Sequence, residues 1–442
     1  MVFAKQVNEL TFDDIQTLVD SEEPEGVTLE YKQQIDTSPG GKKELAKDVS
    51  AMANSQGGHL IIGLAEEDHR PKMPEGFVGR MLGQQKVEEW LDQVLNSNIQ
   101  QRVSVHIKPI PVPGKPEECV VVLHVPPSPR VPHMVTAQND NRYYVRHNFE
   151  VLPAEEYEVR DMFERGRRMR GEVEEYLRKR GYFEPDDDAN FGVNKLTRQL
   201  GMAYFDETSQ PVVEPAHTTV SLVACPTVLE ERIDTPSDEF RHWLDPTKRH
   251  YYPPAMFIPY QSSRGTLGGI IRWNSLPRSE SARVELIREY LAVHRNGYVE
   301  YSYGDGPLLR GHRLLNFVKL VGRFWQFLGF LHDLYQEIEL PSATIVLLNI
   351  ANVEGSHLVG FGHGWRRVSS MIPRTSTGEE CLDRHIQLRD EMDIVAFNDD
   401  RIEQIVREVA TRIGSAFEQE RPRCFNEADN SFPEDLFRGY VE

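Results

Sequence analysis

Residues 25–32, EGVTLEYK, and residues 53–66, ANSQGGHLIIGLAE, are the stretches that decide the fold of the N-terminal part of this chain. In the first stretch, apolar and polar side chains alternate, which places Val27, Leu29 and Tyr31 on one face. In the second stretch, a short apolar run follows two glycines. The alternation predicts a half-buried strand, and the apolar run predicts a fully buried one.

A helix is predicted between these two strands. Leu45, Val49 and Met52 recur at the spacing of one helix face, and Gly57 with Gly58 ends the pattern. Residues 39–41, Pro-Gly-Gly, predict a turn before this helix. The order strand, helix, strand is typical of an α/β unit.

Further segments extend this unit into a mixed sheet with a long helix after it. Residues 87–95 form an amphipathic helical pattern, and residues 103–107, 119–125 and 142–146 read as strands. Residues 154–180 form a long helical pattern dense in both acidic and basic side chains. Such a pattern is typical of a solvated connector.

The C-terminal half predicts a second folded domain. Strands are predicted at residues 219–224, 255–258, 266–272, 298–303 and 344–350, and helices at residues 280–295, 313–337 and 401–417. We therefore predict an α+β protein with a mixed-sheet domain at residues 1–153. A charged helical connector and linker follow at residues 154–190, and a second α/β or α+β domain at residues 191–442.

The composition is that of an ordinary globular protein, with 39% hydrophobic and 27% charged residues among 442. No stretch reaches the ~18 consecutive apolar residues that a membrane span needs, and the N-terminus lacks the pattern of a signal peptide. We therefore expect a cytoplasmic protein without a membrane partner. The four cysteines have no paired spacing, which argues against a zinc site and a disulfide framework.

The net charge of −19 opposes any non-specific attraction to nucleic acid, because that attraction comes from lysine and arginine at phosphates. A nucleic-acid surface on this chain must therefore be local, shared between subunits, or bridged by a divalent metal.

The two opening stretches together resemble the AlbA-like domain of Schlafen-related proteins. Its signature is a Glu-aromatic-Lys strand, a helix that ends in Ala-Asn-x-x-Gly-Gly, and an apolar strand that closes on glycine followed by acids. Residues 128–133, SPRVPH, and 142–146, RYYVR, resemble the closing strands of the same domain. The resemblance implies an AlbA-like mixed-sheet module that handles nucleic acid, RNA rather than DNA, with transfer RNA as the usual target class.

In the members of this family that cut RNA, the resemblance implies a site of three carboxylates. The matching residues here are Glu25, Glu30 and Glu66, and they would bind Mg²⁺ or Mn²⁺. Lys32 lies on the same strand face as Glu30 and would neutralise a phosphate oxygen. The family more often has aspartate where this chain has Glu66, and the neighbouring Glu67 and Asp68 could substitute for it.

Contacts to the nucleic acid are expected from the closing segments. The candidates are Arg130, His133, Arg142, Tyr144 and Arg146. Arginine offers bidentate bonds to phosphate, and a tyrosine could stack a base. Alternating tyrosine and valine are equally typical of a buried strand, so both interpretations of Tyr144 stay open.

Two hypotheses about function follow. In the first, the chain is a metal-dependent endoribonuclease that acts on structured RNA, with a role in microbial antiviral defence, and a homodimer or higher homo-oligomer supplies a second AlbA-like lobe. In the second, the domain is a non-catalytic nucleic-acid-binding or regulatory module, and its acids are a solvated surface. In either case the C-terminal domain would sense a ligand or partner, or complete the oligomer.

Overall fold

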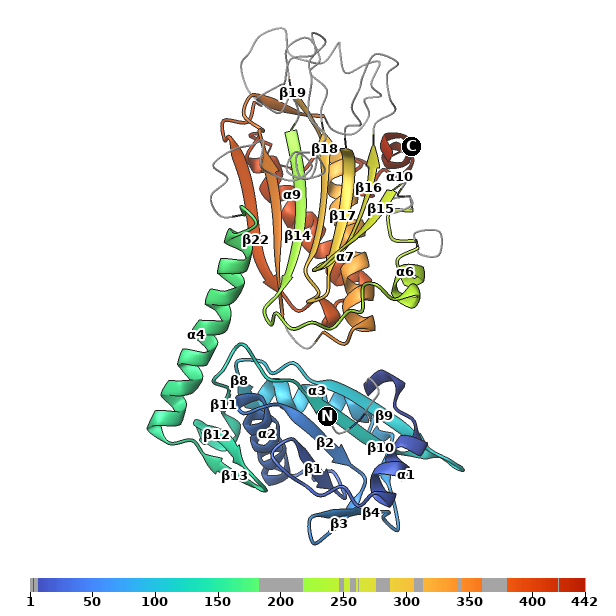
Figure 1. Cartoon of the computed structure of the whole chain (residues 1–442), viewed down its shortest axis with the longest axis vertical. Coiled ribbons are helices and arrows are strands. Elements are labelled where there is room, and N and C mark those ends of the chain that lie inside the picture. Colours follow the sequence, from blue (N-terminus) through green and yellow to red (C-terminus); the bar gives the residue numbers. More distant parts are fainter. Residues whose placement is uncertain are drawn as a thin grey trace. The chain divides into compact units, whose positions relative to one another are not determined.

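The computed structural model describes residues 3, 7–182, 218–245, 250–254, 260, 262–275, 287–305, 313–340, 343–359, 380–419 and 421–441. The fold is α+β, as predicted. The chain divides into two compact units, Met1–Glu172 and Val173–Glu442 (Figure 1). The long charged helix is confirmed as α4 (Glu156–Arg178), which contains the division between the units. The predicted linker that follows α4 lies mostly outside the described residues.

The N-terminal unit is built on a five-stranded mixed sheet. Its strands are β1 (Leu29–Lys32), β2 (Gly58–Ile62), β5 (Val78–Gly79), β9 (His106–Val112) and β10 (Lys115–Val125). The order is β1-β2-β10-β5, and β9 also pairs with β10. Strand β1 runs parallel to β2 and is an edge strand among the described residues, whereas β10 runs antiparallel to β2. The edge position of β1 leaves its outer side available to the segment that precedes it.

Alternating side chains of β2 pack into two separate hydrophobic cores, one on each face of this sheet. Leu60 and Ile62 pack in one core with side chains of α2 (Pro39–Asn54) and α3 (Val87–Asn98). Ile61 packs in the other core with side chains of α1 (Phe12–Asp20) and with the apolar face of β1. A strand buried on both faces is apolar throughout, which is why the sequence shows it as a continuous apolar run.

The turn predicted at residues 39–41 is wrong, because these residues form the first turn of α2. The side chain of Ser38 caps the helix by accepting the N–H of Gly41 at 3.1 Å. Pro39 takes the first helical position, where its missing N–H costs no hydrogen bond and its fixed φ suits the helix. A proline next to two glycines resembles a turn, but the serine before it makes the segment a helix start.

The glycine pair at the end of α2 lets the chain reverse into β2 in very little space. Gly57 and Gly58 have φ values of 73° and 154°. A Cβ on Gly57 would lie 2.5 Å from the carbonyl oxygen of Val125, and one on Gly58 would lie 2.5 Å from the carbonyl oxygen of Thr28. Both glycines are therefore required by the backbone that packs around them.

We expect Gly58→Ala to lower the free energy of unfolding by at least about 3 kcal/mol, because backbone strain adds to a clash with backbone atoms. Gly114→Ala is the matched control, since Gly114 also has positive φ, 77°, but a Cβ there would meet nothing within 4 Å. Strain alone should cost the control about 1 kcal/mol. Urea unfolding of both variants measures the difference, and equal losses would contradict the close approach at Gly58.

A second, smaller sheet and two hairpins complete the N-terminal unit. The sheet has the order β13-β12-β11-β8, with β8 (Ile99–Gln100), β11 (Met134–Val135), β12 (Arg142–His147) and β13 (Glu150–Pro153). The hairpins are β3 (Ala65–Glu67) with β4 (Arg70–Lys72), and β6 (Met81–Leu82) with β7 (Gln85–Lys86). Strand β12 packs on α2, so the smaller sheet lies on the α2 side of the unit.

The C-terminal unit contains a seven-stranded antiparallel sheet of order β15-β16-β17-β18-β14-β20-β22. These strands are β14 (Thr218–Pro226), β15 (Ser262–Thr266), β16 (Gly269–Ser275), β17 (Ile287–His294), β18 (Val299–Asp305), β20 (Thr344–Ala351) and β22 (His385–Met392). Two short strands, β19 (Arg313–Asn316) and β21 (Ser356–Val359), pair in parallel. The helices are α6 (Asp238–Trp243), α7 (Phe317–Glu337), α9 (Asp399–Ser415) and α10 (Glu434–Val441).

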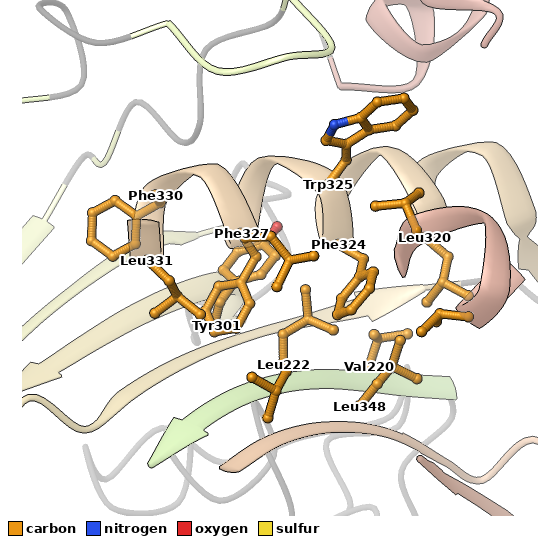
Figure 2. Close-up of a cluster of buried hydrophobic side chains, with 14 of the residues drawn as sticks. Val220, Leu222, Tyr301, Leu320, Phe324, Trp325, Phe327, Phe330, Leu331 and Leu348 are labelled. Carbon is orange, nitrogen blue, oxygen red and sulfur yellow. The ribbon is translucent and has the colours of Figure 1, made fainter. Parts of the chain in front are cut away.

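One face of the large sheet packs against α7, and this contact forms the main core of the unit. Figure 2 shows Phe324 and Phe327 of α7 turned toward Val220 and Leu222 of β14, whereas Trp325 points away from the sheet. The opposite face of β14 and β20 packs against the last turns of α4 and Tyr182. The sheet is thus covered on both sides within this unit.

The helix predicted at residues 280–295 is wrong in its described part, because residues from 287 onward form β17. This strand is hydrogen-bonded to both β16 and β18, and Leu291 and Val293 face the α7 core. Residues 289–293 are buried, with side chains on both faces of the sheet, so the sequence lacks the alternation that would have identified a strand. The strand predicted at residues 255–258 lies outside the described residues.

None of the helices in the described ranges is both long enough and apolar enough to span a membrane. Cys119, Cys225, Cys381 and Cys424 are all buried free thiols.

Candidate functional site

The first element of the candidate site is Glu25, which is held along the outer edge of β1. Residues 27 and 28 form a tight turn that is closed by hydrogen bonds between Gly26 and Leu29. One carboxylate oxygen of Glu25, Oε1, accepts the backbone N–H of Tyr31 at 2.9 Å. Only 6% of the Glu25 side chain is exposed. The carboxylate therefore occupies the place that a neighbouring strand would take at this edge.

The second element is the tip of the β3–β4 hairpin. Asp68 and His69 form its two-residue turn, and both have positive φ, at 52° and 60°, as the tight primed hairpin turns require. Glu66 accepts the backbone N–H of His69 at 3.0 Å. The carbonyl of His69 in turn accepts the N–H of Glu25 at 2.8 Å, which fixes the hairpin tip against the edge of β1.

These two elements bring Glu25, Glu66 and His69 together. One potential ligand atom from each of the three lies within 4.8 Å of the others. The Nδ1 atom of His69 is 2.9 Å from Glu25 Oε2 and 3.6 Å from Glu66 Oε1. The hydrogen bond to the Glu25 carboxylate and the charges of Glu25 and Glu66 raise the pKa of His69. Glu66 and His69 are 39% and 54% exposed, so the cluster is open to solvent on one side.

The three side chains fit a divalent cation. Carboxylate oxygens suit Mg²⁺ and Mn²⁺, whereas an imidazole nitrogen suits transition metals, so the mixed set favours Mn²⁺ over Mg²⁺. A metal would need the neutral imidazole and would replace the proton that Glu25 and His69 share.

Glu30, which we expected to complete this group, belongs to a different cluster. It lies on the opposite face of β1 from Leu29 and Tyr31 and forms an ion pair with Arg146 of β12. Lys32 lies 3.7 Å from Glu30 and 2.8 Å from Asp48 of α2. Burial raises the pKa of Glu30, and Arg146 opposes the rise. Two acids and two bases thus neutralise each other between β1, α2 and β12.

Within this charged cluster, Arg146 positions the turn that carries Glu25. Its side chain has no exposed surface. Besides Glu30, its guanidinium donates to the carbonyl oxygens of Gly26 at 2.8 Å and Leu29 at 3.1 Å. These carbonyls belong to the two residues that close the turn after Glu25.

We expect Arg146→Met to lower the free energy of unfolding by about 3 kcal/mol, because the Glu30 carboxylate would keep its burial and lose its partner. Arg142→Met on the same strand is the control, since 62% of the Arg142 side chain is exposed and its loss should cost under about 0.5 kcal/mol. Adding Glu30→Gln to Arg146→Met should recover part of the loss. Urea unfolding of the four proteins tests this, and an unchanged midpoint for Arg146→Met would contradict the role.

The expected nucleic-acid contacts divide into buried and accessible residues. Arg146, His133 and Tyr144 have at most 4% of their surface exposed, so the expectation that they contact nucleic acid is wrong for this structure. Each of them has a side-chain hydrogen bond within the protein: Arg146 to the carbonyl of Gly26, His133 to the carbonyl of Gln101, and Tyr144 to Asp140. Arg130 is half-buried and Arg142 is exposed, so both stay candidate contacts.

Asn54 is a buried polar side chain that binds the backbone of the closing segments. Its side-chain amide donates to the carbonyl oxygens of His133 and Tyr144, both at 2.9 Å, and its oxygen accepts the N–H of His133 at 2.7 Å. The next residue, Ser55, accepts the N–H of Arg146 through its hydroxyl at 3.0 Å. The Ala-Asn segment therefore joins the end of α2 to β12, which is a structural role.

His133 should make the N-terminal unit sensitive to acid. Its Nδ1 contacts the carbonyl of Gln101 at 2.7 Å, and burial lowers the pKa of His133 to about 4. An unfolded histidine titrates near 6.5, so the unfolded chain binds a proton first as the pH falls. The contribution of neutral His133 to the free energy of unfolding is therefore full above about pH 6.5 and is lost as the pH falls toward 4.

The test replaces His133 with asparagine, whose amide can still donate to Gln101. We expect the urea midpoint of the wild type to fall between pH 7 and pH 5 by more than that of His133→Asn. An identical fall in both proteins would show that His133 does not contribute to the acid sensitivity.

Sequence reasoning missed His69 and Asp48. His69 follows Glu66 by three residues and reaches it only because the hairpin turns back at Asp68. Asp48 lies on the face of α2 that we took as apolar, where it pairs with Lys32. The signal available in the sequence was an aspartate among the apolar residues of one helix face. Such a residue is expected to be buried, and a buried acid needs a basic partner.

The C-terminal unit contains a pocket of about 500 Å³ between α7 and the first turn of α9. Its walls combine aromatic and acidic side chains, including Tyr252, Trp325, His332, Asp333, Asp399 and Glu403. Its volume is in the range that small molecules occupy.

Comparison with known proteins agrees with the N-terminal fold. Residues 25–155 match the Schlafen, AlbA_2 family model, so this part of the chain is a Schlafen AlbA_2 domain, as its motifs indicated. The family points to a function related to nucleic acid. No match was found among curated proteins. The crystal structure of the DIP2311 protein from Corynebacterium diphtheriae also matches part of this chain. The match covers 35% of this chain and 28% of the DIP2311 chain, with 17% sequence identity and a TM-score of 0.24.

Proposed function

We propose that the Schlafen AlbA_2 domain makes this chain a metal-dependent endoribonuclease, with Glu25, Glu66 and His69 as the metal-binding residues. The observation that carries the proposal is the convergence of these three side chains, from two separate turns, at the open edge of β1. When bound, a divalent metal would stabilise the negative charge that develops on the phosphate and would lower the pKa of a bound water.

The chain's own residues have distinct roles in this proposal. Glu25 is the rigid member, because the Tyr31 N–H and His69 both hold its carboxylate. Glu66 is the more exposed carboxylate and faces the side from which RNA arrives. Lys32 keeps 31% of its side chain exposed beside its Asp48 partner and is the candidate contact to a phosphate oxygen. Glu30 becomes a positioning residue, since Arg146 neutralises it.

The proposed substrate is structured RNA such as transfer RNA, and the proposed setting is microbial antiviral defence. Both come from the family resemblance. A homodimer or higher homo-oligomer would place exposed basic residues such as Arg142 of two copies along one RNA, which offsets the net charge of −19. The C-terminal unit would act as a sensor, and its pocket between α7 and α9 is the candidate ligand site.

The charges in the N-terminal unit also favour a second candidate, a non-catalytic nucleic-acid-binding or regulatory module. Protonated His69 can neutralise Glu25 without a metal, and Arg146 already neutralises Glu30. In that case the two acid clusters would serve only to hold the turns of the domain together.

The deciding experiment incubates the protein with total transfer RNA and with single- and double-stranded DNA, in Mn²⁺, in Mg²⁺ and in chelator. We expect RNA cleavage that is fastest in Mn²⁺ and absent in chelator. Glu66→Gln should slow cleavage at least about 100-fold, since a lost ligand removes several kcal/mol of charge stabilisation. Glu67→Gln is the matched control, because Glu67 pairs with Lys72 and lies outside the cluster.

Binding of Mn²⁺, followed by titration calorimetry, gives a readout besides activity. It should be weakened by Glu66→Gln and by His69→Ala but not by Glu67→Gln. Cleavage that survives both substitutions would contradict this site. Retained RNA binding with no cleavage in any metal would favour the second candidate.

A further inference from the structure

An exposed aromatic ring lies directly against the candidate metal site. The ring of Phe149 stacks on the imidazole of His69, with centroids 4.6 Å apart and planes 18° apart. Phe149 nevertheless keeps 48% of its surface exposed. The ring therefore contacts a candidate metal ligand and still offers exposed apolar surface beside the site.

The position of Phe149 is tied to the same anchor as Glu25. Phe149 lies at the tip of the β12–β13 hairpin, next to Asn148, whose φ of 54° makes the turn. Arg146, three residues earlier, bonds the carbonyls of Gly26 and Leu29. His147 pairs with Glu158 of α4 at 3.0 Å. The ring is therefore held at a set place relative to the carboxylates.

Aromatic rings at nucleic-acid sites stack on bases that are not already stacked in a helix. One side of the Phe149 ring is taken by His69, and the exposed remainder can receive a second ring. Glu25 and Glu66 cluster with His69, on which the ring stacks, and Glu150 is the next residue in the chain. Electrostatics near the ring therefore oppose a bare phosphate, and a flat neutral base is the nucleic-acid part that suits it.

We propose that Phe149 is a stacking platform for one unpaired base, next to the phosphate that a metal at Glu25, Glu66 and His69 would hold. The inference rests on the proposed function and refines its substrate class to unpaired segments of RNA, such as loops, bulges and ends. A phenylalanine ring has no hydrogen-bonding group, so the platform distinguishes unpaired from paired bases and accepts any base.

The test measures binding of the full-length protein to a short oligoribonucleotide that contains 2-aminopurine, whose fluorescence is quenched when it stacks. The same oligonucleotide is used as a single strand and in a duplex, in Ca²⁺ in place of Mn²⁺. We expect Phe149→Ala to raise Kd for the single strand about tenfold and to abolish the quench, with duplex binding changed less than about twofold. Phe149→Trp should retain both affinity and quench.

Leu152→Ala is the matched control, because Leu152 lies on the same hairpin and is 42% exposed. It should bind both RNAs like the wild type, and thermal melting of all variants separates a lost platform from a disturbed hairpin. Unchanged affinity and quench in Phe149→Ala would overturn the inference, as would an equal loss for single strand and duplex.

The outcomes for the platform and for the nuclease are separable. If binding and quench depend on Phe149 but no metal supports cleavage, the platform stands and the proposed function fails. If Mn²⁺ supports cleavage that needs Glu66, but Phe149→Ala changes neither Kd nor KM, the proposed function stands and the platform fails.

Discussion

The buried guanidinium of Arg146 is the interaction on which the arrangement of the N-terminal unit depends. It joins a strand of the smaller sheet to the turn that opens β1, through two backbone carbonyls and the Glu30 carboxylate. Since a buried carboxylate without a partner is costly, the two sheets can approach only with this pair formed. Glu25 precedes this turn and Phe149 follows β12. Both residues consequently lie close enough to contact His69.

The candidate site is an assembly of turns around one strand edge. The turn at residues 27–28 presents Glu25, and the β3–β4 hairpin presents Glu66 and His69. Backbone hydrogen bonds fix both turns against the edge of β1, which would suit the metal ligands that we propose there. The open side of the cluster remains in solvent, where an RNA strand can reach it.

The acidic charge of the chain constrains how such a site works. Phosphate is repelled by carboxylates unless a cation lies between them, so a metal would serve both as the reactive group and as the bridge to RNA. The exposed ring of Phe149, if it stacks a base as we propose, would add an attraction that does not depend on charge. Stacking and metal bridging together are a consistent solution for a protein with a net charge of −19.

The family resemblance of the sequence indicated the domain type and proposed the acids Glu25 and Glu66. The sequence by itself determined a strand within residues 27–32 and the buried strand after the glycine pair. These depend on local patterns, since alternation, helical spacing and glycine requirements are written within a few residues. It could not determine that Glu30 pairs with Arg146, because those residues are 116 apart in the chain. It likewise could not show that β17 is a strand, since the segment has no regular alternation and its extended form depends on pairing with two neighbouring strands. Partners of charged groups and the choice between strand and helix in buried segments were decided by tertiary packing, where burial sets the cost of every unpaired group.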